Sequence, residues 1–142
     1  MGDLDRERVL IKIDELESYM REVELILPAS FEEYSKVEKK RACERVLQLV
    51  IETTIDICHL LVTELRLGLP AEEDDLFGKL ASAGVVTKAM EDTLRSMKGL
   101  RNVLVHEYAK VDDDLVYKAM TTRMKDFRLF AEEIRTFLRF RA

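Results

Sequence analysis

The sequence has few residues that interrupt helices. Its 142 residues include only five glycines and two prolines, which argues against a fold built from many turns. Leucine, glutamate, lysine, arginine, methionine and alanine are abundant, and all of them favour helix. The length is that of one ordinary domain with a hydrophobic core of its own. We therefore predict an all-α protein whose single domain spans residues 1–142.

Cysteines and long apolar runs are also scarce. Cys43 and Cys58 lack the spacing of a zinc site, and a core of this size needs no disulfide. We expect both thiols to be reduced and partly buried. The charged N-terminus is unlike a signal peptide, and no uninterrupted apolar run reaches the roughly 20 residues that span a bilayer. We expect a cytoplasmic protein that is neither exported nor inserted into a membrane.

The net charge of −5 excludes a broad basic surface. A protein that binds DNA or membranes without selectivity normally presents such a surface, so any contact with nucleic acid must be local. One basic group suits that contact, although the alternative is a solvated helix face. It comprises Lys36, Lys39, Lys40, Arg41 and Arg45.

Apolar residues recur at steps of three and four along most of the chain, as in amphipathic helices. Pro28, Gly68, Pro70 and Gly84 interrupt the pattern. Thr87 is suited to cap the helix that follows it, and Asp112, Asp113 and Asp114 can cap the last helix. Short connections favour an antiparallel bundle of four to five helices. The predicted helices cover residues 4–27, 34–67, a short segment ending near 80, 87–108, and one from 112 to near the C-terminus.

The fourth predicted helix ends in a cluster of polar residues. Asn102 and His106 are four residues apart and share one face, whereas Arg101 and Tyr108 are seven apart and almost eclipse each other. An imidazole can move a proton near neutral pH, and a guanidinium can hold phosphate oxygens. Asn102 can orient either group. These residue types suit cleavage of RNA without a metal, because the ribose 2′-hydroxyl is itself the nucleophile.

A structural interpretation of the same residues stays open. A histidine near a helix C-terminus complements the helix dipole, and Arg101 with Tyr108 can form a solvated ladder. The other histidine, His59, lies in an apolar stretch, and we expect it to be packed or at an interface.

The arrangement Arg101-Asn102-x-x-x-His106-x-Tyr108 resembles the HepT toxins of the HEPN superfamily. The resemblance extends over most of the chain, through residues 41–56, 70–86, 97–100, 111–112 and 116–117. It implies a HEPN-like bundle and a metal-independent endoribonuclease without a cofactor. Arg101 and His106 are then the catalytic pair, with Asn102 as the polar residue after the arginine. It also implies a homodimer in which two copies of the motif meet in one composite cleft that cleaves RNA, with tRNA among the candidate substrates.

The same resemblance implies a toxin–antitoxin pair. The partner is an MntA-like minimal nucleotidyltransferase, which transfers AMP from ATP onto the tyrosine of the His-x-Tyr element, here Tyr108. An added phosphodiester beside Arg101 would occupy its anion site and block RNA entry.

Four polar residues recur every fourth position on the second predicted helix and so form one strip: Glu44, Gln48, Glu52 and Asp56. A solvated face is one interpretation. The family resemblance places the strip near the composite cleft or the dimer seam, where a carboxylate would orient His106 or pair with Arg101. A metal site would need a second set of ligands, which the sequence does not offer.

Two other functions remain open. A non-catalytic helper of a nucleotidyltransferase would use Arg101 and His106 to hold a nucleotide or RNA without cleaving it. A purely structural dimerisation bundle would not need either residue.

Overall fold

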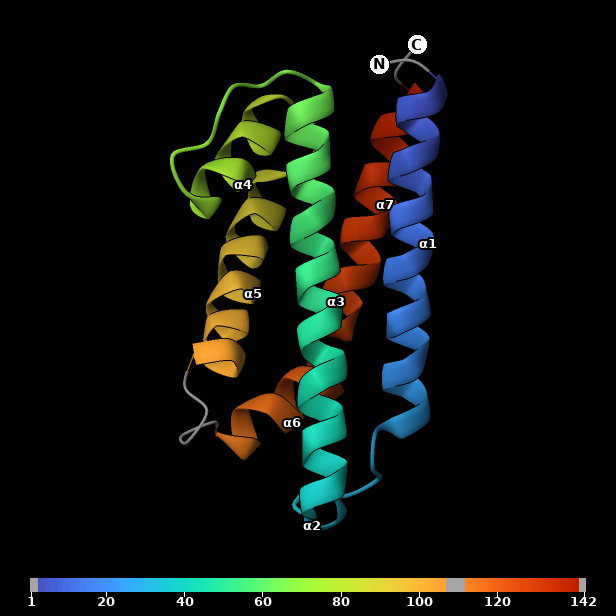
Figure 1. Ribbon diagram of the computed structural model, residues 1–142, viewed down its shortest axis with the longest axis vertical. Coiled ribbons are helices and arrows are strands. Elements are labelled where there is room, and N and C mark those ends of the chain that lie inside the picture. Colours follow the sequence, from blue (N-terminus) through green and yellow to red (C-terminus); the bar gives the residue numbers. More distant parts are fainter. Residues whose placement is uncertain (1–2, 107–111, 141–142) are drawn as a thin grey trace.

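The computed structural model of the chain describes residues 3–106 and 112–140, and over these ranges it consists of helices without strands (Figure 1). The four long helices run alternately in opposite directions, so that neighbours along the chain are antiparallel (Figure 1). The prediction of an all-α antiparallel bundle is therefore confirmed. The helices are α1 (Asp3–Ile26), α2 (Phe31–Tyr34), α3 (Val37–Glu64), α4 (Glu73–Ser82), α5 (Lys88–His106), α6 (Asp113–Thr122) and α7 (Met124–Phe140).

The structure differs from the prediction in two places. A separate turn, α2, precedes the helix predicted over 34–67, because the Ser30 hydroxyl accepts a hydrogen bond from the Glu33 amide at 3.2 Å and starts a helix there, and the long helix itself starts at Val37. The last predicted helix is interrupted at Arg123, which leaves helical geometry with φ −111° and ψ 0°. Just before it, the Thr122 hydroxyl donates to the Lys118 carbonyl at 2.6 Å, the kind of local bond that competes with the helix.

The predicted caps before α5 and α6 are confirmed. The Met90 amide donates to the Thr87 hydroxyl at 3.1 Å, which caps α5. The Asp112 carboxylate accepts hydrogen bonds from the amides of Asp114 and Leu115 at 2.9 and 3.3 Å, which caps α6. Gly84 adopts a φ of +74° after α4, a conformation that favours glycine and ends that helix.

Helix α3 is the centre of the bundle and packs against α1, α2, α4, α5 and α6. Both cysteines lie on it, free and buried, as predicted, and burial raises the pKa of the Cys58 thiol. By length and composition alone α3 could cross a membrane, but 56% of its apolar window is buried inside the bundle. That burial is the property of a core helix.

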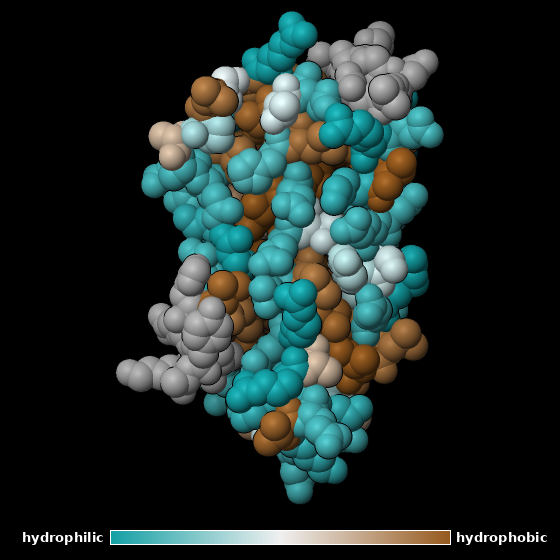
Figure 2. Space-filling view, in the orientation of Figure 1, coloured by the Kyte–Doolittle hydropathy of each residue, from teal (hydrophilic) through white to brown (hydrophobic). Residues whose placement is uncertain are grey.

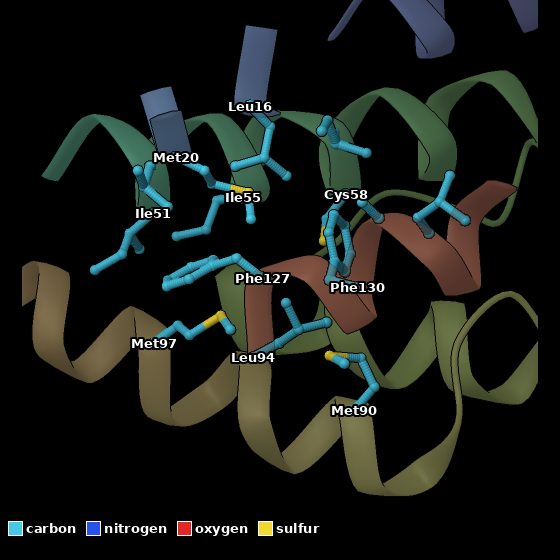
Figure 3. Packing of buried hydrophobic residues seen from close by; sticks show 14 of the residues in the cluster. Leu16, Met20, Ile51, Ile55, Cys58, Met90, Leu94, Met97, Phe127 and Phe130 are labelled. Atoms are coloured by element: carbon cyan, nitrogen blue, oxygen red, sulfur yellow. The ribbon is translucent and has the colours of Figure 1, made fainter. Parts of the chain in front are cut away.

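The apolar residues of α5 determine how this helix is rotated. Met90, Leu94 and Met97 point toward Phe127 and Phe130 of α7 (Figure 3). All five side chains are at most 2% exposed. Their spacing of four and three residues defines one side of α5 as the core side. This rotation decides which polar residues of α5 meet α4.

A second, aromatic contact lies at the end of the bundle where α2 meets α6. Tyr34 is fully buried, and its ring centroid is 5.3 Å from that of Tyr117 and 5.9 Å from that of Phe31. Burial raises the pKa of Tyr34. The Tyr117 hydroxyl donates to the carbonyl of Pro28 at 3.3 Å. The turn after α1 is therefore covered by aromatic rings.

Candidate active site

The predicted catalytic motif lies at the end of α5. The structure describes the side chains of Arg101 and Asn102 and the helical backbone up to His106. The side chain of His106 and the whole of Tyr108 lie outside the described residues. The predicted pairing of Asn102 with His106 on one face, and of Arg101 with Tyr108, therefore stays a prediction.

The guanidinium of Arg101 is held from two sides. Its Nε donates to the Oδ1 of the neighbouring Asn102 at 3.0 Å, and its Nη2 donates to a carboxylate oxygen of Glu73 on α4. The Arg101 side chain is 17% exposed, so it is largely buried but still reached by solvent. Arginine has five N–H donors on three nitrogens, and Nη1 makes no hydrogen bond within the described ranges. Among the described residues, that edge of the cation therefore has no partner.

Further ion pairs join α4 to α5 next to Arg101. The Asp74 carboxylate lies 2.7 Å from Lys98 Nζ and 3.4 Å from Arg95 Nη1. The hydrogen bond from Lys98 is the main cause that lowers the pKa of Asp74. Arg95 also donates to Glu91 at 2.6 Å. Arg95, Lys98 and Arg101 of α5 therefore each pair with a carboxylate of α4, and Arg95 also pairs with a carboxylate of α5 itself.

Sequence reasoning did not identify Glu73 as a site residue. The acidic run at residues 72–75 lies at the start of α4, where its charge complements the positive end of the helix. The run also has long-range partners, because α4 lies against α5. Glu72 and Asp75 form the capping box of α4. The signal available in the sequence was that the same run also contains carboxylates with no capping role.

The polar strip on α3 has its own hydrogen bonds. Glu44 binds Arg41 through both carboxylate oxygens at 2.8 and 3.0 Å, and Gln48 donates to Glu52 at 3.0 Å. Asp56 is exposed. Within one chain, the carboxylate that binds Arg101 comes from α4 and not from this strip. The role of the strip in a cleft or dimer seam is not tested by these contacts.

Some of the five basic residues at the start of α3 are paired with carboxylates, and the others are exposed. Arg41 is bound to Glu44, and Lys40 lies 3.4 Å from Asp113. The other three members are exposed: Lys36, Lys39 and Arg45. In the view toward α3 the surface along this helix is mainly hydrophilic (Figure 2).

His59 is exposed on α3. A histidine packed inside the chain is therefore excluded at this position, and an interface role remains. No group of three or more histidine, cysteine, aspartate or glutamate residues is placed to hold a metal ion in the ranges that the structure describes.

Comparison with known proteins agrees with this geometry. A solved structure described as the tri-AMPylated Shewanella oneidensis HEPN toxin in complex with MNT antitoxin superposes with a TM-score of 0.83 and 25% identity, over 96% of this chain and 99% of that one. Among curated relatives, the mRNA nuclease HepT of Shewanella oneidensis is 34% identical over 89 residues, which are 63% of this chain and 67% of that protein. The tRNA nuclease HepT of Aphanizomenon flos-aquae is 29% identical over 110 residues, or 77% and 75% of the two chains.

The fold and these relatives define the class as a helical ribonuclease toxin of a toxin–antitoxin system. The model of the family described as "Ribonuclease HepT-like" matches residues 16–134, and the chain belongs to that family. The resemblance inferred from the motif at residues 101–108 is thereby confirmed.

Proposed function

We propose that this ribonuclease toxin is a metal-independent endoribonuclease in which Arg101, His106 and Asn102 act on the RNA backbone. The observation that carries the proposal is the guanidinium of Arg101. It is fixed by Asn102 and Glu73, retains an edge without a hydrogen bond in the described ranges, and lies on the helix that continues to His106. A fixed cation with free donors suits the charge that develops on a phosphate in the transition state.

The proposed reaction needs proton transfer and charge stabilisation only. The ribose 2′-oxygen attacks the adjacent phosphorus while its proton leaves, and the bond from phosphorus to the 5′-oxygen of the next nucleotide breaks. The products are a 2′,3′-cyclic phosphate and a 5′-hydroxyl, which takes up a proton. His106 moves these protons, and Arg101 binds the non-bridging phosphate oxygens.

A homodimer supplies the complete site in this proposal. Residues five apart on a helix lie about 140° apart around its axis and about 7.5 Å apart along it. Arg101 and His106 of one α5 therefore face different directions. Two copies packed around the ends of α5 would bring the arginine of one protomer toward the histidine of the other. The strip Glu44, Gln48, Glu52 and Asp56 is then a candidate for the seam.

We further propose that an MntA-like nucleotidyltransferase neutralises the toxin in the cytoplasm. The Tyr108 hydroxyl attacks the α-phosphorus of ATP, loses its proton, and releases pyrophosphate, which leaves AMP on the tyrosine. Tyr108 is two residues from His106 in the sequence. A phosphodiester there would add negative charge beside Arg101 and prevent RNA from binding.

Cleavage by purified, unmodified protein tests the proposal directly. Protein made by cell-free synthesis is incubated with total RNA and with tRNA in the presence of EDTA, and the new ends are mapped. We expect 2′,3′-cyclic phosphate ends, and loss of cleavage for His106→Ala and Arg101→Ala. Asp92→Ala is the control, because it changes an exposed residue of the same helix nine residues before Arg101 and should cleave normally.

Intact RNA after incubation with wild-type protein, or equal cleavage by His106→Ala, would reject the proposal. Calorimetry with ATP, AMP and RNA then identifies a non-catalytic helper, which would bind without turnover.

Tyr108→Phe tests neutralisation. The variant lacks the acceptor hydroxyl, so intact-mass measurement with the antitoxin and ATP should detect no AMP adduct, while RNA cleavage continues. An adduct of the same mass on Tyr108→Phe would show that another residue is the acceptor.

A further inference from the structure

Arg101 occupies an unusual position for a charged residue. It follows Met97 by four residues and precedes Leu104 by three, so it falls on the line of α5 that faces the core. Met97 is 2% exposed and Leu104 is 8% exposed. A cation on this line is largely removed from water, and its orientation depends on the groups that bind it.

Glu73 is the only acidic partner of Arg101 in the described ranges. It binds Nη2, whereas Asn102 binds Nε. Two contacts on different nitrogens fix the plane of the guanidinium, which one contact would leave free to rotate. The neighbouring side chain Asn102 follows Arg101 on the same helix. Among the described residues, Glu73 is therefore the one that fixes Arg101 relative to another element.

The element that carries Glu73, α4, is packed into the core. Three side chains of α4 are fully buried: Leu76, Phe77 and Leu80. At the start of the helix, the Asp75 carboxylate accepts the Ala71 amide at 2.8 Å, and Asp74 binds Lys98 at 2.7 Å. Each carboxylate of the run thus has a separate partner, and Glu73 is the one that reaches the motif. A group held on a packed helix keeps a precise geometry.

From these contacts we infer that Glu73 is a positioning residue for the ribonuclease reaction. It holds the Arg101 guanidinium so that the Nη1 edge meets the scissile phosphate. This inference rests on the proposed function of Arg101. In the opposite role, the Glu73 carboxylate would compete with phosphate for Arg101. That role predicts faster cleavage when Glu73 is removed, so the direction of the change in cleavage rate separates the two roles.

The test compares Glu73→Ala and Glu73→Gln with Asp74→Ala. Asp74 is the matched control, because it lies on the same turn of α4 and pairs with α5 but does not contact the motif. Each protein cleaves a single fluorescent RNA oligonucleotide chosen from the mapped sites of the wild type. We expect kcat of Glu73→Ala to fall by about tenfold to hundredfold, the scale of a misplaced catalytic group, with a smaller change in KM.

Glu73→Gln should recover most of the lost kcat, because its amide oxygen still accepts the hydrogen bond from Arg101. Asp74→Ala should cleave at the wild-type rate. Urea unfolding of all three variants checks that they are folded. In nitrogen-edited NMR spectra, the Arg101 Nε–Hε signal should shift or broaden in Glu73→Ala and remain in place in Asp74→Ala.

The outcomes are distinguishable from those of the proposed function. If the wild type cleaves and Arg101→Ala does not, but Glu73→Ala cleaves as fast as Asp74→Ala or faster than the wild type, the positioning role is wrong and the ribonuclease proposal stands. If Arg101→Ala cleaves like the wild type, both fail.

Discussion

Helix α5 makes two different kinds of contact with its neighbours, apolar packing and ion pairs. On one side Met90, Leu94 and Met97 pack into the core against α7 (Figure 3). On the other side Arg95 and Lys98 pair with carboxylates of α4 and of α5 itself, while Arg101 lies at the end of the apolar line and pairs with Glu73 of α4. Burial of apolar side chains contributes most of the stability, whereas partly exposed ion pairs contribute about 1 kcal/mol or less each. The apolar side therefore holds α5 in place, whereas the ion pairs add less stability and fix the orientation of individual side chains, Arg101 among them.

The largest effect should come from the apolar side. Leu94 is fully buried, and Leu94→Ala should lower the free energy of unfolding by about 3 kcal/mol through lost burial and a cavity. Urea titration followed by circular dichroism measures the change. Ser96→Ala, an exposed position on the same helix, should stay close to the wild type. Equal midpoints for the two variants would show that this side of α5 is not a packed core.

A smaller and pH-dependent effect should come from the charged side. The hydrogen bond from Arg95 lowers the pKa of Glu91 from its ordinary value of 4.5, against the opposing effect of burial. A carboxyl with a lowered pKa stabilises the fold above its ordinary pKa, and this contribution disappears as the pH falls through the lowered value. Glu91→Gln should thus cost about 1 kcal/mol at pH 7 and progressively less below pH 4.5.

The measurement is urea unfolding of both proteins from pH 7 down to the acid limit of the native state. Asp92→Asn is the control, since Asp92 is exposed and pairs only with Lys88 at 3.4 Å in the described ranges. A cost for Glu91→Gln that grows on acidification would contradict the assigned direction of the pKa shift.

A third comparison uses two glycines with free space around them. An added Cβ at Gly99 or at Gly84 meets no atom within 4 Å, but Gly84 has a φ of +74° whereas Gly99 is helical. Gly99→Ala should raise the free energy of unfolding by about 0.5 to 1 kcal/mol, because alanine favours helix. Gly84→Ala should lower it by a similar amount. Both are measured at a concentration where the chain is monomeric, and changes of the same sign would be inconsistent with backbone geometry as the cause.

The smallest effect concerns the seam between α1 and α7. Arg135 donates from two nitrogens to the Glu17 carboxylate at 3.0 and 2.6 Å, and the pair is about one-third exposed. Arg135→Lys retains the charge but loses the guanidinium that binds both carboxylate oxygens. It should lower the free energy of unfolding by about 0.5 kcal/mol at low salt. The loss should shrink in high salt. Thermal unfolding in both salts measures it, and a loss as large as that of Leu94→Ala would remove the distinction between the two kinds of contact.

Helix positions were largely predictable because they depend on local signals. The capping residues Thr87 and Asp112 and the terminating Gly84 act over a single turn, and each has the predicted role. The separate helix α2 and the break at Arg123 were missed. Both depend on side-chain hydrogen bonds, at Ser30 and Thr122, that compete with an otherwise continuous apolar pattern.

The candidate site was predictable only in part. Arg101 and Asn102 were selected by type and spacing, and they are in contact. Glu73 was not selected, because it is 28 residues from Arg101 and nothing in its own neighbourhood indicates that partner. The α3 strip was an equally regular acidic pattern, and within one chain it binds Arg41 and itself instead.

The sequence alone determined that this chain is a helical bundle with a HepT motif, since helix periodicity and motif spacing are properties of neighbouring residues. Only the tertiary structure decided which carboxylate holds the motif arginine. The rotation of α5, set by Met90, Leu94 and Met97, and the docking of α4 through its buried residues bring Glu73 to Arg101. Such a pairing results from packing between helices, which no local pattern specifies.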